Sequence, residues 1–393
     1  MSKLIFGLVL SSTVLFAGAA KAENFKLSGN KHWLAVASTK NLDDAIGIAR
    51  VLGSEGSRVV YSESGYYGVV LGPYVTNSVE ELKKKNEYLN QLPSDALLSN
   101  GALYIETVWK ADPNSNVLSV YEKDKPVQLS SDDLSVTVKL EKTGHNQYST
   151  VVFGGQPDSP QFSFTVGKDG DFADSGSGAA LMKLDPKSAV PQLVFNRFTG
   201  GAHCCTNTWI AFKMESTSGW SLKDLGKLDG GGYWFEDVDG DGGQELLSVD
   251  NAFLYAFDSY AGSFAPLHIS KFQNGSVDDV SEEAPMRSRL KQDLAGMEYQ
   301  AKINADLWKS NGFLVAWVAS KMRLGDGADA WSTVMENYDR SAEFGPQECT
   351  SGQKIDDCPS DNLKTIAFPK ALASFLKENG YGPLPDAAEQ ELK

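Results

Sequence analysis

The residues of this sequence best suited to chemistry lie in one short acidic segment, Asp237-Val238-Asp239-Gly240-Asp241-Gly242-Gly243-Gln244-Glu245. Its carboxylates fall at positions 1, 3, 5 and 9, and its glycines permit the tight backbone that surrounds a hard cation with oxygen atoms. Because carboxylates this close together repel one another without a cation, we predict a calcium site. An EF-hand loop would carry a bidentate glutamate at position 12, where this chain has Ser248.

The same segment resembles the acidic loops of FG-GAP and VCBS-type β-propeller repeats, in which the loop precedes a hydrophobic strand. That resemblance implies that calcium is held by the side-chain oxygens of Asp237, Asp239, Asp241 and Glu245 and by the carbonyl oxygen of Gly243. The alternative is an acidic, solvated turn that binds no metal. Two related segments are not expected to bind, since residues 183–186 lack the carboxylates and residues 168–171 form a weaker acidic turn.

Adjacent cysteines follow a histidine in His203-Cys204-Cys205, a pattern open to several kinds of chemistry. These are a vicinal disulfide, a bridge to another cysteine, a soft-metal site and a nucleophile. Zinc ligands are normally spaced because neighbouring Cβ vectors diverge, and a nucleophile needs a base and an orienting acid that no other Cys or His motif supplies. Among the pairings open to four cysteines, we predict Cys349–Cys358 and Cys204–Cys205. His203 is then a structural hydrogen-bonding residue, and no catalytic residue is predicted.

Around these residues the hydrophobic pattern predicts three regions that follow a signal peptide. The first, residues 23–112, has strand patterns at 33–37, 58–61, 67–71 and 103–109. Its helices begin after Asn41 and after Ser78, which forms a capping box with Glu81 and starts a helix that continues through Leu89. Gly72-Pro73 is expected to end the third strand. The order βαββαβ predicts a ferredoxin-like α/β sandwich.

This order, together with the tract Tyr67-Gly68-Val69-Val70-Leu71-Gly72-Pro73-Tyr74, resembles the SPOR domain, a bacterial module that binds peptidoglycan glycan strands. The resemblance implies peptidoglycan or another glycan as the partner. Flat aromatic faces suit the apolar faces of pyranose rings. We therefore predict that Tyr66, Tyr67 and Tyr74 stack on sugars, the alternative being that they pack against the helices.

The second region, residues 113–284, follows a turn-rich linker at 111–116 and alternates with the period of two that strands show. Its strand patterns include 134–140, 161–166, 192–195, 208–212, 245–249 and 253–257. A weak repeat relates residues 184–213 to 238–258, so we predict a β-rich propeller-like or sandwich domain. Residues 285–393 change to helical spacing, which predicts a helical C-terminal region in which Trp308, Trp317 and Trp331 pack rather than bind. The predicted class is therefore multidomain α+β.

The first 22 residues have the features of a secretory signal peptide, with a basic start, an apolar stretch at 4–17 and Ala20-Lys21-Ala22 before the cleavage point. The apolar stretch is shorter than the roughly 20 residues of a membrane-spanning helix. We therefore expect a periplasmic or secreted protein without stable membrane insertion. The 393 residues include 51 acidic and 36 basic residues, a net charge of −15 that argues against a nucleic-acid partner.

These features together predict a non-enzymatic, calcium-stabilised binding protein that contacts peptidoglycan or another glycan. One alternative is a secreted module that binds an envelope protein, with the SPOR-like unit as a scaffold. Another is a Cys/His-dependent envelope enzyme centred on His203, Cys204 and Cys205.

Overall fold

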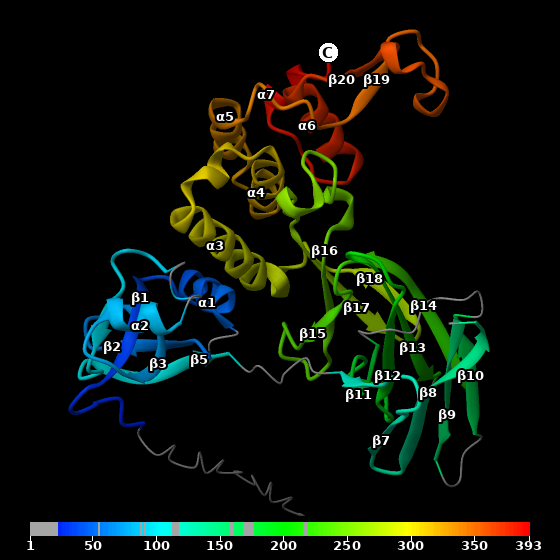
Figure 1. Cartoon of the computed structure of the whole chain (residues 1–393), viewed down its shortest axis with the longest axis horizontal. Helices are drawn as coiled ribbons and strands as arrows, with labels where there is room; N and C mark the ends of the chain where they lie inside the picture. The colour runs from blue at the N-terminus through cyan, green and yellow to red at the C-terminus, as the bar shows by residue number, and fades with distance from the viewer. Residues whose placement is uncertain are drawn as a thin grey trace, which may run out of the picture.

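A computed structural model describes residues 23–393, apart from residues 54–55, 87–88, 90–91, 112–117, 146, 157–160, 168–176 and 215–218. The predicted signal peptide, most of the predicted linker and the acidic turn at 168–171 lie outside the described residues. The chain is multidomain and α+β, with antiparallel sheets up to residue 279 and mainly helices after residue 284 (Figure 1). Within the described residues, no helix is long and apolar enough to cross a membrane.

The first region is a five-stranded sheet with two helices. Its elements are β1 (Lys31–Thr39), α1 (Leu42–Val51), β2 (Arg58–Ser62), β3 (Tyr67–Val75), α2 (Val79–Lys85), β4 (Leu97–Ser99) and β5 (Tyr104–Lys110). The strands lie in the order β4-β1-β3-β2-β5, and every neighbouring pair is antiparallel. Asn41 Oδ1 accepts a hydrogen bond from Asp43 N at 2.9 Å, and Ser78 Oγ accepts one from Glu81 N at 3.1 Å, so both helices begin where the sequence predicts. However, α2 ends at Lys85 rather than continuing through Leu89.

Two strand predictions in this region are wrong in detail. β3 does not end at Gly72-Pro73 but continues to Val75, because a shift in pairing register between His32 and Leu34 accommodates the Gly-Pro step. Residues 103–109 do form a strand, but β5 pairs with β2, and the three-residue β4 takes the place beside β1. Tyr104 contacts Phe25, with ring centroids 6.1 Å apart, and this packing favours the position of β5 at the β2 edge.

Both helices of the first region pack on the same face of the sheet. That core contains Leu34, Val36, Val59 and Val69 from the strands, Ala45 and Ile46 from α1, and Leu82 from α2. The opposite face carries a smaller cluster of Phe25, Trp33, Val60 and Val70. The segment that precedes β1 therefore covers part of the face that lacks helices.

The second region consists of three antiparallel sheets. The first has the order β10-β9-β8-β7 and contains β7 (Val127–Ser131), β8 (Leu134–Gly144), β9 (Gln147–Gly155) and β10 (Phe162–Val166). The second has the order β14-β13-β12-β11-β6 and contains β6 (Ser119–Val120), β11 (Gly178–Met182), β12 (Gln192–Phe198), β13 (Cys204–Lys213) and β14 (Trp220–Asp229). The third has the order β15-β16-β17-β18 and contains β15 (Trp234–Glu236), β16 (Glu245–Val249), β17 (Leu267–Gln273) and β18 (Ser276–Asp279).

These sheets stack face to face, with the second between the other two. Leu193 and Phe195 share a core with Val136 and Val152 of the first sheet. The alternating residues Val194 and Ile210 instead share a core with Phe235, Leu246 and Phe272 of the third sheet. Burial on both faces explains why the consecutive residues Leu193, Val194 and Phe195 of β12 are all apolar.

The predicted strand at 253–257 is wrong. The structure places η3 (Asn251–Phe253) and turns there, followed by η4 (Tyr260–Gly262). A strand would put residues 253, 255 and 257 on one face. Instead Phe253 and Phe257 are buried, whereas Tyr255 between them is 45% exposed and has φ 61°.

The C-terminal region is helical, as predicted, with one small hairpin. Its elements are η5 (Ala284–Met286), α3 (Arg287–Ile303), η6 (Ala305–Lys309), α4 (Asn311–Leu324), α5 (Gly327–Asn337), β19 (Gln347–Cys349), η7 (Ile355–Asp357), η8 (Ser360–Asn362), β20 (Leu363–Thr365), α6 (Phe368–Glu378) and α7 (Asp386–Gln390). Its core includes Leu247 and Ile269 of the third sheet, so this region continues the stack. Trp317 and Trp331 are buried there, and Trp308 packs at its edge.

Helix α3 also joins the first region to the rest of the molecule, since it lies against α1 (Figure 1). A Cβ atom added at Gly47 would lie 2.1 Å from the carbonyl oxygen of Gln292, so the two helices approach as closely as glycine allows. Arg50 donates to Glu236 Oε2 at 3.1 Å and to Gln292 Oε1 at 3.0 Å. The contact therefore combines close backbone packing with polar bonds from a partly buried arginine.

Candidate functional site

The predicted calcium ligands lie in the loop that connects β15 to β16. Gly240 and Gly242 have φ of 76° and 86°, which lets the loop turn back on itself. Asp237 accepts hydrogen bonds from Gly240 N at 2.8 Å and Gly242 N at 3.1 Å. One carboxylate oxygen each from Asp237, Asp239 and Glu245 lies within 4.8 Å of the others. The fold therefore brings together three of the four predicted carboxylate ligands.

A residue that the sequence analysis missed lies among these carboxylates. Lys271 on β17 has Nζ 2.7 Å from Asp239 Oδ2 and 3.4 Å from Glu245 Oε1, and it also donates to Asp241. Its side chain is 13% exposed. In the sequence Lys271 is one of the residues that interrupt the apolar positions of Leu267-His268-Ile269-Ser270-Lys271-Phe272, and the pairing of β17 with β16 could not be read from that pattern.

Opposing effects set the protonation of these groups. Burial disfavours the charged form of Lys271, but hydrogen bonds to Asp239 and Asp241 outweigh it and raise its pKa. Burial also raises the pKa of Glu245, against a lowering by the hydrogen bond from Val238 N. Four carboxylates and one ammonium leave a charge of −4 + 1 = −3 in the loop.

The donor set fits calcium. Calcium takes six to eight oxygen ligands, and carboxylates and backbone carbonyls are typical among them. Glu245 is fully buried, and the polar partner of its Oε1 among the described residues is the Lys271 ammonium at 3.4 Å. A divalent ion would offset more of the loop charge than the single ammonium of Lys271, so the lysine is a competitor for the same carboxylates.

The three predicted sugar-stacking tyrosines do not form one surface. Tyr66 is 38% exposed in the turn between β2 and β3. Tyr67 and Tyr74 are half-buried against the core that faces the helices. At about 3.3 Å per residue, the eight residue steps along β3 separate Tyr66 from Tyr74 by roughly 25 Å. The structure thus places Tyr67 and Tyr74 as the packing alternative describes, and leaves Tyr66 open to solvent.

His203 has an orienting acid that the sequence analysis did not find. Its Nδ1 lies 2.8 Å from Asp229 Oδ1, and its Nε2 lies 2.6 Å from the Tyr255 hydroxyl. Its ring stacks on Tyr260, with centroids 3.9 Å apart and planes at 14°. Burial, followed by the charge of Asp229 and by Tyr255, raises the pKa of Tyr260. These partners lie 26 or more residues away in sequence, so no local motif identifies them.

The four cysteines are paired as two bridges. Cys349 is joined to Cys358, with Cα atoms 5.8 Å apart, and Cys204 is joined to Cys205. Among the described residues no cysteine is free. The first bridge closes the segment between β19 and β20, and the second lies at the start of β13.

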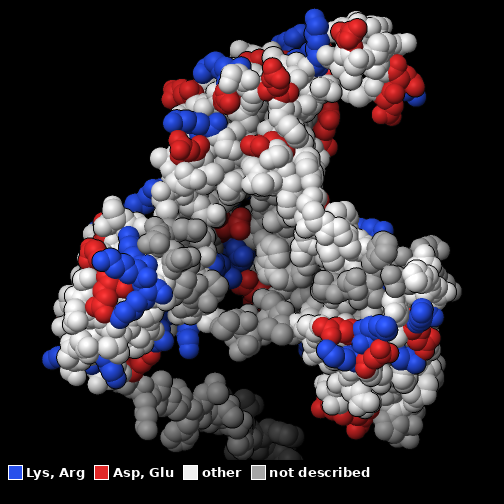
Figure 2. Space-filling model, in the orientation of Figure 1, with Lys and Arg blue, Asp and Glu red and all other residues white. Residues whose placement is uncertain are grey.

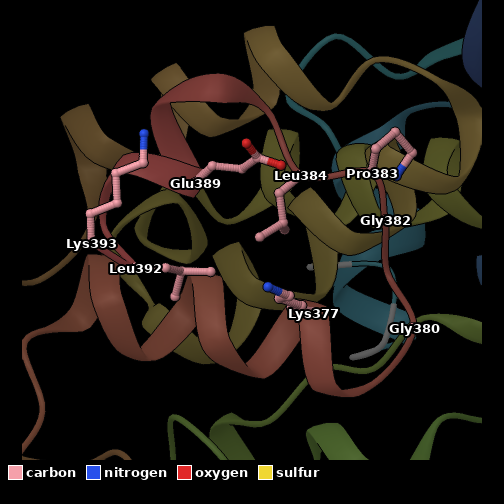
Figure 3. A pocket seen from close by; sticks show the side chains of 8 residues that line it. All are labelled: Lys377, Gly380, Gly382, Pro383, Leu384, Glu389, Leu392 and Lys393. Carbon is pink, nitrogen blue, oxygen red and sulfur yellow. The ribbon is translucent and has the colours of Figure 1, made fainter.

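Two surface hollows lie away from the acidic loop and from His203. One, of about 500 Å³, lies between α6 and α7, where Lys377, Leu384 and Leu392 project toward it (Figure 3). The other, of about 480 Å³, lies between the first region and α3 and includes Asp44 and Glu298. On the face seen in Figure 2, acidic and basic side chains are interspersed rather than gathered by sign.

Comparison with known proteins finds similarity to one family model and to two curated proteins. Residues 287–380 match a family model described as the sll0997 C-terminal domain. The chain is 34% identical over 392 residues to an uncharacterized protein, y4bJ, of Sinorhizobium fredii, an alignment that covers 98% of this chain and 62% of the relative. It is 37% identical over 202 residues to a probable thylakoid lumen protein, sll0997, of Synechocystis, which covers 51% of this chain and 59% of the relative.

The chain thus spans about 60% of the length of these curated relatives. No solved structure matches it significantly.

Proposed function

We propose that this chain is a non-enzymatic, extracytoplasmic binding protein that contacts peptidoglycan or another glycan and is stabilised by calcium. The observation that carries the proposal is the strand order β4-β1-β3-β2 with α1 and α2 on one face of the sheet. This arrangement supports a ferredoxin-like sandwich, the fold that the SPOR resemblance implies. β5 is then an additional strand at the β2 edge.

Tyr66 is the residue of this region best placed to contact a sugar. It is 38% exposed, and Lys40 Nζ lies over its ring, 5.3 Å from the centroid. The ammonium holds one face of the ring by a cation–π contact. The exposed part of the ring would stack on a pyranose ring. Tyr67 and Tyr74 contribute by supporting the strand that leads from this turn.

Two observations support an extracytoplasmic location. The two cysteine bridges suit an oxidising compartment, in which disulfides persist. The Synechocystis relative is named as a probable thylakoid lumen protein, and the lumen is a compartment outside the cytosol. Together with the signal-peptide features of the first 22 residues, they favour a periplasmic or secreted protein.

The middle region supports the calcium part of the proposal. Three consecutive antiparallel sheets stacked face to face resemble blades of a β-propeller, and the acidic loop lies between two strands of the third sheet. Asp237, Asp239, Asp241 and Glu245 would hold the ion with the Gly243 carbonyl, and calcium would supply the positive charge that relieves their repulsion. Lys271 would leave the carboxylates when calcium binds.

The glycan partner is tested by sedimentation of the full chain with purified sacculi, before and after amidase has removed the stem peptides. The proposal expects retention that increases on the amidase-treated material, because bare glycan strands are the expected ligand. Absence of retention on both materials would reject it. Capture of an envelope protein by a chain that ignores sacculi would instead favour the protein-partner alternative.

A further inference from the structure

A second cluster of polar and aromatic side chains lies in the middle region, around His203. Three segments that are distant in sequence meet there. They are His203 just before β13, Asp229 at the end of β14, and the segment that carries Tyr255 after η3 and Tyr260 at the start of η4. Among the described residues, neither the acidic loop 237–245 nor the first region contacts this group. The site is therefore separate from both features on which the proposed function rests.

The hydrogen bonds fix the role of each group. Because the Asp229 carboxylate accepts at 2.8 Å from Nδ1 of His203, the proton of the neutral imidazole lies on Nδ1. Nε2 is then an acceptor, and the Tyr255 hydroxyl donates to it at 2.6 Å. The lone pairs of that hydroxyl stay available to a ligand. Tyr260 stacks on the imidazole at 3.9 Å and completes an ordered aromatic group.

Tyr255 is unusual for a residue with only a packing role. It is 45% exposed, and its φ of 61° is uncommon for a residue with a bulky side chain. Strained, exposed aromatic residues of this kind cluster at binding sites, where the surrounding structure holds them in place. The bond to His203 supplies that support here.

A cavity adjoins the aromatic group on the side of Asp229 and Tyr260. Its volume is about 260 Å³, and its lining includes Tyr233, Trp234 and Asn251. Asn251 Oδ1 is buried and accepts no hydrogen bond from the described residues. Sites for drug-sized ligands measure roughly 300–1,000 Å³, so this cavity suits one ring rather than an extended chain.

The chemistry of the lining selects among ligands. Lysine and arginine are absent from the described residues that line the cavity, so an anion has no partner there. Asp229 is already bonded to His203, which reduces its attraction for a cation. What remains are aromatic faces, a free amide acceptor and hydroxyl groups, which complement the apolar face and the hydroxyls of a sugar.

We propose that Tyr255, Tyr260 and the adjoining cavity bind a single ring of a neutral saccharide. His203 and Asp229 act as positioning residues, since they hold the two tyrosines rather than touch the sugar. The site is independent of the SPOR-like region and does not require calcium.

The test uses the full chain and four probes, which are N,N′-diacetylchitobiose, maltose, cellobiose and choline, each titrated by isothermal calorimetry. We expect saturable binding of at least one disaccharide. Tyr260→Ala should weaken it tenfold or more, and Tyr255→Phe, which removes only the hydroxyl, should weaken it several-fold. The exposed Phe344→Ala serves as the control and should bind as the wild type does.

Thermal unfolding of each variant shows whether a loss of binding reflects misfolding. If Tyr260→Ala does not fold, the binding measured for Tyr255→Phe still tests the proposal. The proposal would be overturned if no disaccharide bound or if only choline bound. It would also be overturned if the wild type and Tyr255→Phe bound a disaccharide equally well. Sacculus retention is measured on the same samples, so this site and the proposed function succeed or fail separately.

Discussion

The ammonium of Lys271 lies 2.7 Å from the carboxylate of Asp239, a residue 32 positions earlier in the chain. Through this ion pair, a lysine side chain of β17 contacts the loop in which a metal ion is predicted. The loop therefore has one cation of its own, but that cation offsets only part of the charge of four carboxylates. A metal ion bound in this loop would compete with the Lys271–Asp239 pair, and this competition can be measured.

Calcium should raise the thermal stability of the chain. At a concentration one hundred times the dissociation constant, a ligand adds about 2.7 kcal/mol, which corresponds to a rise of roughly 5–10 °C for a domain of this size. Asp239→Ala should remove this rise, whereas the exposed Asp361→Ala should keep it. Differential scanning calorimetry with calcium and with chelator is the measurement, and equal melting temperatures in the two buffers would count against the site.

Replacing the competing lysine should strengthen metal binding. Lys271→Met keeps the apolar stem but removes the ammonium that contacts Asp239 and Asp241. We expect the calcium affinity to rise by about tenfold, equivalent to about 1.4 kcal/mol, and the chelated variant to unfold below the wild type because the carboxylates then lack a counter-charge. Calorimetric titration would contradict this account if the variant bound calcium more weakly than the wild type.

The contact between α1 and α3 should depend on Gly47. In an isolated helix, alanine is favoured over glycine by about 1 kcal/mol, so Gly47→Ala would stabilise α1 if the helix stood alone. Its Cβ would lie 2.1 Å from the Gln292 carbonyl oxygen, however, so we expect a loss of about 1–3 kcal/mol. Gly53→Ala, where the nearest atom is 3.9 Å away, is the matched control. Urea unfolding distinguishes them, and equal midpoints would mean that the helices do not pack this closely.

Asp279 should contribute stability that is lost in acid. Burial raises the pKa of this carboxyl, but hydrogen bonds from the Oγ and N of Ser281 outweigh it and lower the pKa. A depressed folded pKa stabilises the protein fully above the unfolded value of about 3.9, and the effect disappears as pH falls through the folded value.

The urea midpoint of Asp279→Asn should therefore lie below that of the wild type at pH 7, and the gap should close below about pH 4. The neighbouring Asp278→Asn, on the same strand, controls for the loss of charge. A gap that stays constant from pH 7 to pH 3 would show that Asp279 acts through packing alone.

Much of the fold was predictable because local rules decided it. Asn41 and Ser78 cap helices, and alternating residues such as Val136 and Val138 are buried on one face of a strand. The prediction failed where tertiary packing overrode the pattern. Phe253 and Phe257 are residue types that favour a strand. The chain turns between them instead, and this turn buries both side chains in the core of the helical region.

The sites were predictable only as far as their residues are neighbours in sequence. The carboxylates of residues 237–245 form one motif, so their meeting could be foreseen. Lys271 reaches them because β17 pairs with β16, and Asp229 and Tyr255 reach His203 because β14 and the loop after η3 meet at the start of β13. Such meetings depend on strand pairing, which a single sequence does not specify.

The central claim is that the chain binds a glycan through its first region. It is tested most directly by the fraction of full chain retained on amidase-treated sacculi, measured for the wild type, for Tyr66→Ala and for the exposed-aromatic control Phe344→Ala. We expect retention of the wild type and the control, with at least a several-fold loss for Tyr66→Ala. Equal retention of all three proteins, or retention of none, would contradict it.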